Sequence, residues 1–212
     1  DFDNLYHWNP LYFPKIKVHT SYSIESYGEH RCLKAESNNS ASALVYKHKF
    51  NVYEFPLVKW RWKVENVYAR GDAKNKEGDD YPLRVYIIFD YNPENAGFFE
   101  KLTYNSAKLL YGQYPPASSL NYIWSNREHT EKVLPNSYTK KAQMFLLQSG
   151  ESNVGKWIIE NINIVRDYHV AFGKPPPDIA RMAIMNDSDN TGETSVSYLD
   201  YIEIYRKGER DE

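Results

Sequence analysis

Basic, acidic and phenolic side chains recur at every second position in three stretches of the sequence, a spacing that places them on one face of a β-strand. In LVKWRWKV, for example, the tryptophans and valines must be buried, so the interleaved lysines and arginine point the other way. Guanidinium, ammonium, carboxylate and phenol groups hydrogen-bond sugar hydroxyls and pair with acidic groups. The pattern predicts either a concave ligand-binding groove or a solvated outer face whose charges pair with one another. The residues of this polar face are Glu36, Arg61, Lys63, Arg84 and Tyr86.

An acidic pair, Asp79-Asp80, ends the polar loop RGDAKNKEGDD and stands just before Arg84. Two carboxyl groups could act as general acid and general base. Adjacent residues of an extended strand point to opposite sides, however, so the two are not expected to converge on one substrate atom. Pairing of one aspartate with an arginine of the polar face is the alternative.

The loop NDSDNTGE contains the start of a calcium-binding pattern, D-x-D-x-x-G, in which Asp187 and Asp189 supply carboxylate oxygens. The pattern then departs from a calcium loop, because Tyr198 occupies the position of the bidentate glutamate. A turn between two strands, stabilised by local hydrogen bonds of aspartate and asparagine, explains the same residues. Asp187 and Asp189 are therefore candidate calcium ligands, and Asp189 and Asn190 are candidate ligand-binding residues.

Several function classes are disfavoured by composition and by missing motifs. The formal net charge of −2 is too acidic for a general nucleic-acid binder, and no apolar run approaches the roughly 18 residues of a membrane span. The sequence has no H-x-H, H-E-x-x-H, P-loop, G-x-G-x-x-G or G-x-S-x-G motif. Cys32 is the single cysteine, so no internal disulfide is expected. Apart from calcium, we expect no cofactor.

The elements that must position these residues are mostly strands. About ten strand patterns without βα alternation favour an all-β fold, an antiparallel β-sandwich that is jelly-roll-like or galactose-binding-like, in a single domain over residues 1–212. Two short helices are expected, at Asn95–Gly112 and at Arg166–Phe172, each ended by glycine and proline. The predicted strands are Ile16–Ser26, Arg31–Glu36, Ala43–Phe50, Leu57–Val67, Arg84–Asp90, Ser119–Ser125, Ala142–Gln148, Trp157–Val165, Ile179–Asn186 and Ser195–Tyr205.

Taken in order, the blocks WRWKV, GDDY-x-x-RVY, NYIWSN and DSDNTGE resemble the bacterial family called domain of unknown function 3047. The resemblance extends from Phe13 to Ile204. It implies an exported protein of the periplasm or envelope, and no established activity can be carried over from it. Within NYIWSN, Trp124 joins the candidates as a stacking platform. The closing block SVSYLDYIEI is similar to the last strand of jelly-roll carbohydrate-binding modules.

We therefore expect a non-catalytic glycan-binding sandwich that takes an oligo- or polysaccharide in a polar groove. Export would require a signal peptide removed before the sequence begins at DFDNLYHW. One alternative is a polysaccharide lyase or hydrolase, in which Arg61 or Arg84 neutralises a uronate and Tyr86 or the acidic pair handles the proton. Another is an envelope scaffold that binds proteins through exposed tyrosine and tryptophan. The sequence does not predict the oligomeric state.

Overall fold

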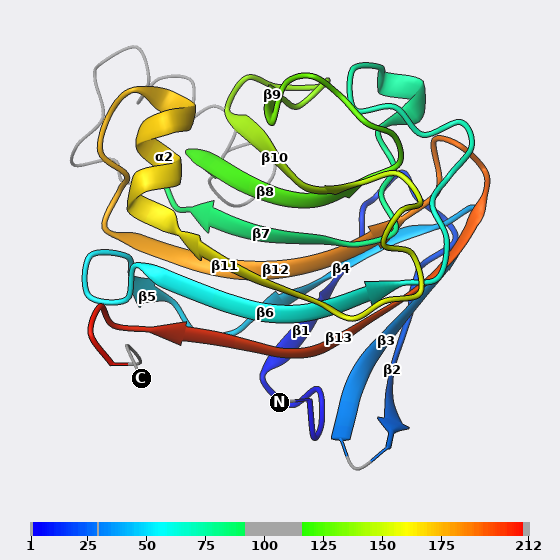
Figure 1. The fold of residues 1–212 in the computed structure, drawn as a ribbon, viewed down its shortest axis with the longest axis horizontal. Coiled ribbons are helices and arrows are strands. Elements are labelled where there is room, and N and C mark those ends of the chain that lie inside the picture. The colour runs from blue at the N-terminus through cyan, green and yellow to red at the C-terminus, as the bar shows by residue number, and fades with distance from the viewer. Residues whose placement is uncertain (1, 29, 92–115, 210–212) are drawn as a thin grey trace.

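The computed structural model describes residues 2–28, 30–91 and 116–209 and confirms an antiparallel β-sandwich. Two sheets pack face to face, with helix α2 (Ile164–Phe172) at one end beside β8 and β11 (Figure 1). The predicted helix at Asn95–Gly112 lies outside the described residues. Within those residues, no helix is both long and apolar enough to cross a lipid bilayer.

The larger sheet, sheet A, has eight strands in the order β1-β4-β12-β7-β8-β10-β9, and β5 also pairs with β12. Neighbouring strands are antiparallel except β8 and β10, which run parallel. Its strands are β1 (Trp8–Leu11), β4 (Ala41–Tyr46), β5 (Phe50–Asn51), β7 (Arg84–Phe89), β8 (Ser118–Ser125), β9 (Val133–Pro135), β10 (Ala142–Ser149) and β12 (Ile179–Asp187).

The smaller sheet, sheet B, has five strands in the order β11-β6-β13-β3-β2, all antiparallel to their neighbours. Its longest strand, β13, pairs with both β6 and β3 and therefore joins their outer faces into one surface. The strands are β2 (Ser21–Tyr27), β3 (His30–Asn38), β6 (Leu57–Val64), β11 (Ile158–Asn163) and β13 (Thr194–Tyr205).

The core between the sheets is built from the alternate residues of each strand. Trp60 and Trp62 of β6 are fully buried, as the alternation in LVKWRWKV requires. The ring of Trp62 lies 5.7 Å from that of Trp124 in the opposite sheet, and Trp60 lies 5.6 Å from Tyr122. Large aromatic side chains from both sheets therefore interlock and fix which face of each strand is outer.

Local signals set the ends of α2. The side chain of Asn163 caps the helix by accepting a hydrogen bond from the Arg166 N–H, and Gly173 ends it in a left-handed conformation with φ of 68°. The helix thus begins at Ile164, two residues before the predicted start at Arg166, and ends at the predicted residue, Phe172. A 3-10 turn, η1 (Lys76–Gly78), lies just before the acidic pair.

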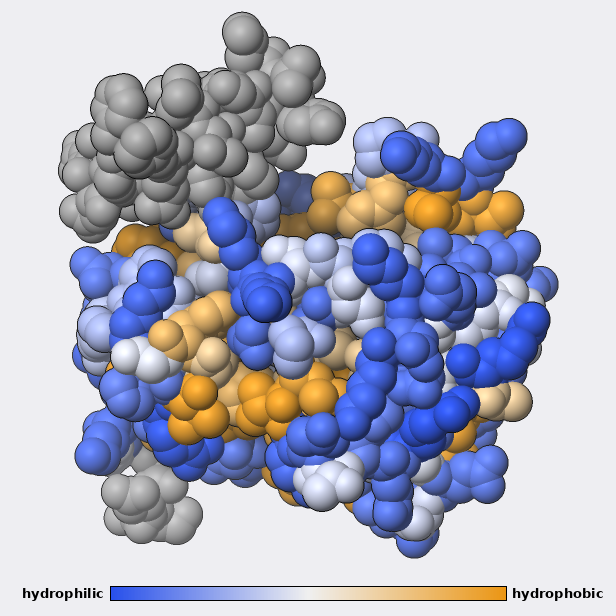
Figure 2. Space-filling model, turned by 90° about the horizontal axis from the view of Figure 1, so that it is seen from above, coloured by the Kyte–Doolittle hydropathy of each residue, from blue (hydrophilic) through white to orange (hydrophobic). Residues whose placement is uncertain are grey.

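The surface seen from above is mostly hydrophilic, and apolar side chains emerge between the polar ones in a few patches (Figure 2). Large apolar side chains that are exposed on the described part of the chain include Ile159 in β11 and Val170 in α2. Single exposed apolar residues of this kind are common in soluble domains and need no functional explanation.

Candidate functional site

The residues of the predicted polar face divide between opposite sides of the sandwich. Arg61 and Lys63 of β6 and Glu36 of β3 lie on the outer face of sheet B, whereas Arg84 and Tyr86 of β7 belong to sheet A. Since the packed core separates the two outer faces, the five side chains do not meet in one groove.

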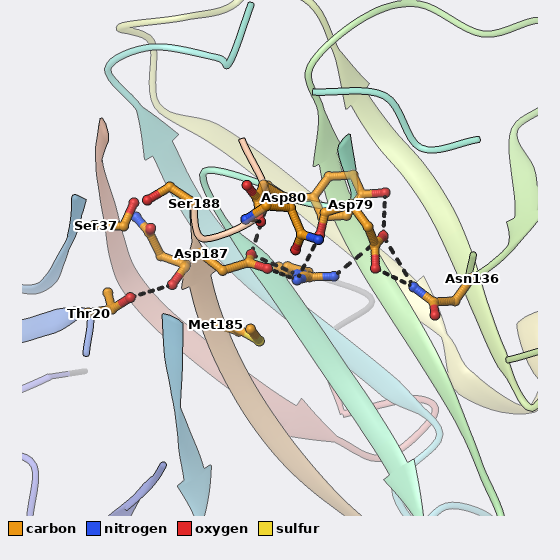
Figure 3. A network of polar contacts seen from close by, with 12 residues as sticks. Thr20, Ser37, Asp79, Asp80, Asn136, Met185, Asp187 and Ser188 are labelled. Atoms are coloured by element: carbon orange, nitrogen blue, oxygen red, sulfur yellow. Dashed lines mark hydrogen bonds and ion pairs between the residues drawn. The ribbon is translucent and has the colours of Figure 1, made fainter. Parts of the chain in front are cut away.

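Arg84, the first residue of β7, is buried in an ion-pair cluster with Asp79 and Asp187, whose carboxylates are labelled in Figure 3. Its Nε donates to Oδ1 of Asp187 at 3.1 Å, and its Nη2 donates to Oδ2 of the same carboxylate. Its Nη1 lies 3.9 Å from Oδ1 of Asp79, and its guanidinium packs 4.6 Å from the centre of the Tyr81 ring. With its donors turned inward, Arg84 is placed to stabilise the fold rather than to contact a ligand.

The two carboxylates of the acidic pair diverge, and one of them meets Arg84. Asp79 accepts hydrogen bonds from the Tyr81 hydroxyl at 3.0 Å and from Nδ2 of Asn136 at 2.9 Å. Asp80 accepts instead from the backbone N–H groups of Asn190 and Thr191, at 3.3 and 2.6 Å. The pair therefore anchors two different loops and does not converge on a common point.

Three carboxylates gather where β12 ends, because Asp80 joins the two predicted calcium ligands, Asp187 and Asp189. One oxygen of each lies within 4.8 Å of the others. Burial raises the pKa of Asp189, and the neighbouring charge of Asp80 adds to that shift. Arg84 already binds Asp187, and both oxygens of Asp80 accept backbone N–H groups. The calcium hypothesis stays a prediction.

Asn190 and Tyr86 lie on either side of this cluster. Asn190 donates from Nδ2 to the hydroxyl of Tyr138 and to the carbonyl of Lys76, each at 2.9 Å. These bonds fasten the loop after β12 to the turn η1. Tyr86 is half-buried, and its hydroxyl lies 3.6 Å from the sulfur of Met185. Both residues thus take part in packing the outer side of sheet A.

Trp124 is fully buried in the core and cannot stack on a ligand at the surface. Its indole N–H donates to the carbonyl of Gly150 at 3.2 Å, and its ring packs on Trp62. Alternation explains this placement, because Leu120, Tyr122 and Trp124 share the inward face of β8.

The outer face of sheet B carries a cluster of three aromatic side chains that sequence reasoning did not single out, and that we name the aromatic platform: Tyr27, Trp157 and Tyr198. Tyr27 and Trp157 meet edge to face with ring centres 5.3 Å apart, and Trp157 lies 6.3 Å from Tyr198. Tyr27 is 47% exposed, so the platform reaches solvent.

Arg61 and Lys63 are held against the aromatic platform. The ammonium of Lys63 lies 4.6 Å from the centre of the Tyr198 ring and 4.9 Å from that of Tyr27. The guanidinium of Arg61 lies 4.8 Å from the Trp157 ring. Such cation–π contacts fix long, flexible side chains in one orientation.

Carboxylates on the same face pair with these cations. Glu65 lies 2.6 Å from Lys63, and Asp200 lies 3.4 Å from Arg61. Burial alone would lower the pKa of Lys63, but Glu65 outweighs it, so the pKa lies above its ordinary value and the ammonium is charged. Glu36 pairs with Lys34 at 3.2 Å, and the surface therefore combines aromatic rings with charged groups of both signs.

Comparison with known proteins places residues 6–203 within the family described as protein of unknown function DUF3047. No curated protein matches the chain. Among solved structures, endoglucanase 3 of family GH12 from Trichoderma harzianum is similar with a TM-score of 0.42 and 7% identity, over 95% of this chain and 99% of that one. The Emp46p carbohydrate recognition domain in metal-free form is similar with a TM-score of 0.41 and 12% identity, over 96% of this chain and 89% of that one. A family 12 xyloglucanase from Bacillus licheniformis, in complex with ligand, is similar with a TM-score of 0.38 and 8% identity, over 96% of this chain and 88% of that one. At these TM-scores the likenesses carry no argument about this chain.

Proposed function

The chain belongs to the DUF3047 family, and from its own geometry we propose that it is a non-catalytic carbohydrate-binding β-sandwich. The ligand is an oligo- or polysaccharide that lies on the outer face of sheet B, across the aromatic platform and beside Arg61 and Lys63. The proposal includes an exported location, in the periplasm or envelope of a bacterium, where such polymers are accessible.

One observation carries the proposal: three aromatic rings from separate segments converge on one exposed sheet face beside oriented charged groups. A pyranose ring has an apolar C–H face that packs against aromatic rings and a rim of hydroxyls that needs hydrogen-bond donors and acceptors. The platform supplies the first. Arg61 and Glu36 supply the second, and the buried ammonium of Lys63 lies against the rings and supports them.

The ion pairs around the platform support the non-catalytic part of the proposal. Glycoside hydrolysis needs a protonated carboxyl group facing a second carboxylate across the scissile bond. The carboxylates nearest the platform each form an ion pair with a lysine or an arginine instead of facing one another; they are Glu25, Glu36, Glu65 and Asp200. On the other sheet, a lyase built on Arg84 would have to break its contacts with Asp187 before the guanidinium could meet a uronate.

The test is a binding screen of the full chain against neutral and acidic polysaccharides by affinity electrophoresis, followed by calorimetry with oligosaccharides. We expect Trp157→Ala and Tyr198→Ala to weaken binding by about tenfold or more, because truncated aromatic anchors lose most of their contact area. The matched control is Tyr12→Ala, an exposed aromatic outside the platform whose ring stacks on His19.

Circular dichroism establishes that each variant is folded. If the two platform variants bind as tightly as the wild type, or if no polysaccharide binds, the proposal is wrong. A protein partner captured through the same residues would instead favour the envelope-scaffold hypothesis.

A further inference from the structure

Two histidines lie side by side at the end of the β1–β4 pair. His7 directly precedes β1, and His48 follows β4 by two positions. The register pairs Trp8 with Tyr46, and the N–H of Lys47 donates to the carbonyl of His7 at 2.9 Å. Antiparallel pairing therefore continues past the strand end and brings the two imidazoles together.

The nitrogens that face each other are Nδ1 of His7 and Nε2 of His48, 3.2 Å apart. Burial does not force the contact between the rings, since both side chains are exposed. A hydrogen bond between two neutral exposed imidazoles contributes little, because each ring exchanges a water partner of similar strength. When the protons sit instead on the outer nitrogens, each of the two facing nitrogens has a lone pair that can bind a cation.

That separation is the one expected of two ligands on a single metal ion. Zinc–nitrogen bonds of about 2.0–2.1 Å at a tetrahedral angle place the two nitrogens roughly 3.3 Å apart. Imidazole nitrogen is a preferred ligand of zinc and of its neighbours in the transition series. The pair can therefore accept an ion with almost no change in the distance between the rings.

Aromatic neighbours hold both rings in place. The ring of Tyr46 lies 5.3 Å from that of His48 and 6.3 Å from that of His7, and Tyr6 meets His7 edge to face at 5.1 Å. Such support reduces the rotational freedom that the imidazoles would lose on binding a metal.

Beside His7, between the sheets, is a pocket of about 460 Å³ whose lining includes two oxygen-bearing side chains, Asp3 and Asn4. Apolar side chains also line it, among them Phe2, Trp8 and Met182. Only two imidazoles approach one another here, so a bound ion would keep positions open for water, unlike a structural zinc with four protein ligands.

We propose that His7, which lines this pocket, and His48 form a two-imidazole site for a borderline divalent cation, zinc in the first place. The ion completes its coordination with water. The site is independent of the carbohydrate-binding proposal, because none of its residues belongs to the aromatic platform.

The test is titration of the full chain with Zn²⁺ in a weakly coordinating buffer near pH 7.5, followed by calorimetry and by the imidazole proton resonances. We expect one ion per chain, with perturbation of the resonances of His7 and His48. His7→Gln and His48→Gln should each lower the affinity by more than about tenfold, since loss of even an outer-shell partner costs that much. His30→Gln, at another exposed histidine, is the matched control and should bind like the wild type.

Unchanged affinity in either variant would overturn the proposal, and so would the absence of zinc binding by the wild type. No sugar enters the experiment, so its outcome does not depend on carbohydrate binding.

Discussion

Replacing Arg84 with methionine should destabilise the fold and leave carbohydrate binding unchanged. Methionine keeps much of the apolar volume of the arginine side chain, so the main loss is the charge and its hydrogen bonds. The partners left behind are Asp187, which is 2% exposed, and Asp79, which is 5% exposed. Both would then be buried without their guanidinium partner.

The expected magnitude follows from that burial. Removing one member of a buried ion pair costs about 3–5 kcal/mol, because the remaining charge stays desolvated without compensation. For a chain of this size each kcal/mol lowers Tm by about 2–4 °C, so Tm should fall by roughly 6–20 °C. In Arg84→Met with Asp187→Asn, the second change removes the stranded charge, and the double variant should lose less than the sum of the single variants.

Urea unfolding followed by tryptophan fluorescence measures the free energies, and calorimetry with an oligosaccharide measures binding at a temperature where all variants are folded. A loss of stability with intact affinity agrees with a structural Arg84. The reasoning is refuted if Arg84→Met retains its stability within about 1 kcal/mol while its affinity for the sugar falls, since Arg84 would then be a ligand-binding residue.

Two further outcomes are expected. Asp189→Asn should stabilise the protein by up to about 1 kcal/mol at pH 7, because it removes a half-buried charge close to Asp80. The check is the Tm of both proteins, measured in Ca²⁺ and in EDTA. If Ca²⁺ raises the Tm of the wild type but not that of the variant, the calcium hypothesis is supported instead. Burial raises the pKa of Glu160, against hydrogen bonds from Gln148 and Trp62. The folded state then binds the Glu160 proton more tightly than the unfolded state, so the stabilisation from this proton is complete below the unfolded pKa and is lost as pH rises through the folded pKa. Between about pH 4 and 7, urea unfolding should therefore show a smaller loss of stability for Glu160→Gln than for the wild type. Equal losses in the two proteins would contradict the raised pKa.

Much of the fold could be predicted from period-two alternation and turn residues. The pattern of LVKWRWKV requires its tryptophans to be buried, and they are. The short edge strands were harder to predict. Strand β1 contains Pro10, which lowers strand propensity in a sequence but is tolerated at the edge of a sheet, where β1 lies. Strand β5 has only two residues and depends on its pairing with β12.

The candidate site was less predictable, because alternation states which residues share a face of one strand and not which sheet the strand joins. The residues of the aromatic platform lie far apart in sequence, and only the pairing of β13 with β3 and β6 brings Tyr198 beside Lys63. Each aromatic alone resembles an ordinary strand residue. The signal that sequence could have offered was the surplus of tyrosine over what the core requires.

Arg61 and Arg84 show why residue type and spacing do not decide function here. Each follows a strand pattern that points it away from the core, and each has aspartate and aromatic neighbours. The difference lies in what covers them. The loop that contains Asp79 and the end of β12 at Asp187 cover Arg84, so its charge must be neutralised within the protein. The side chain of Arg61 remains 32% exposed on an open sheet face, where a ligand can reach it. Long-range folding of polar loops, rather than the strand pattern, therefore separates a stabilising arginine from one available for binding.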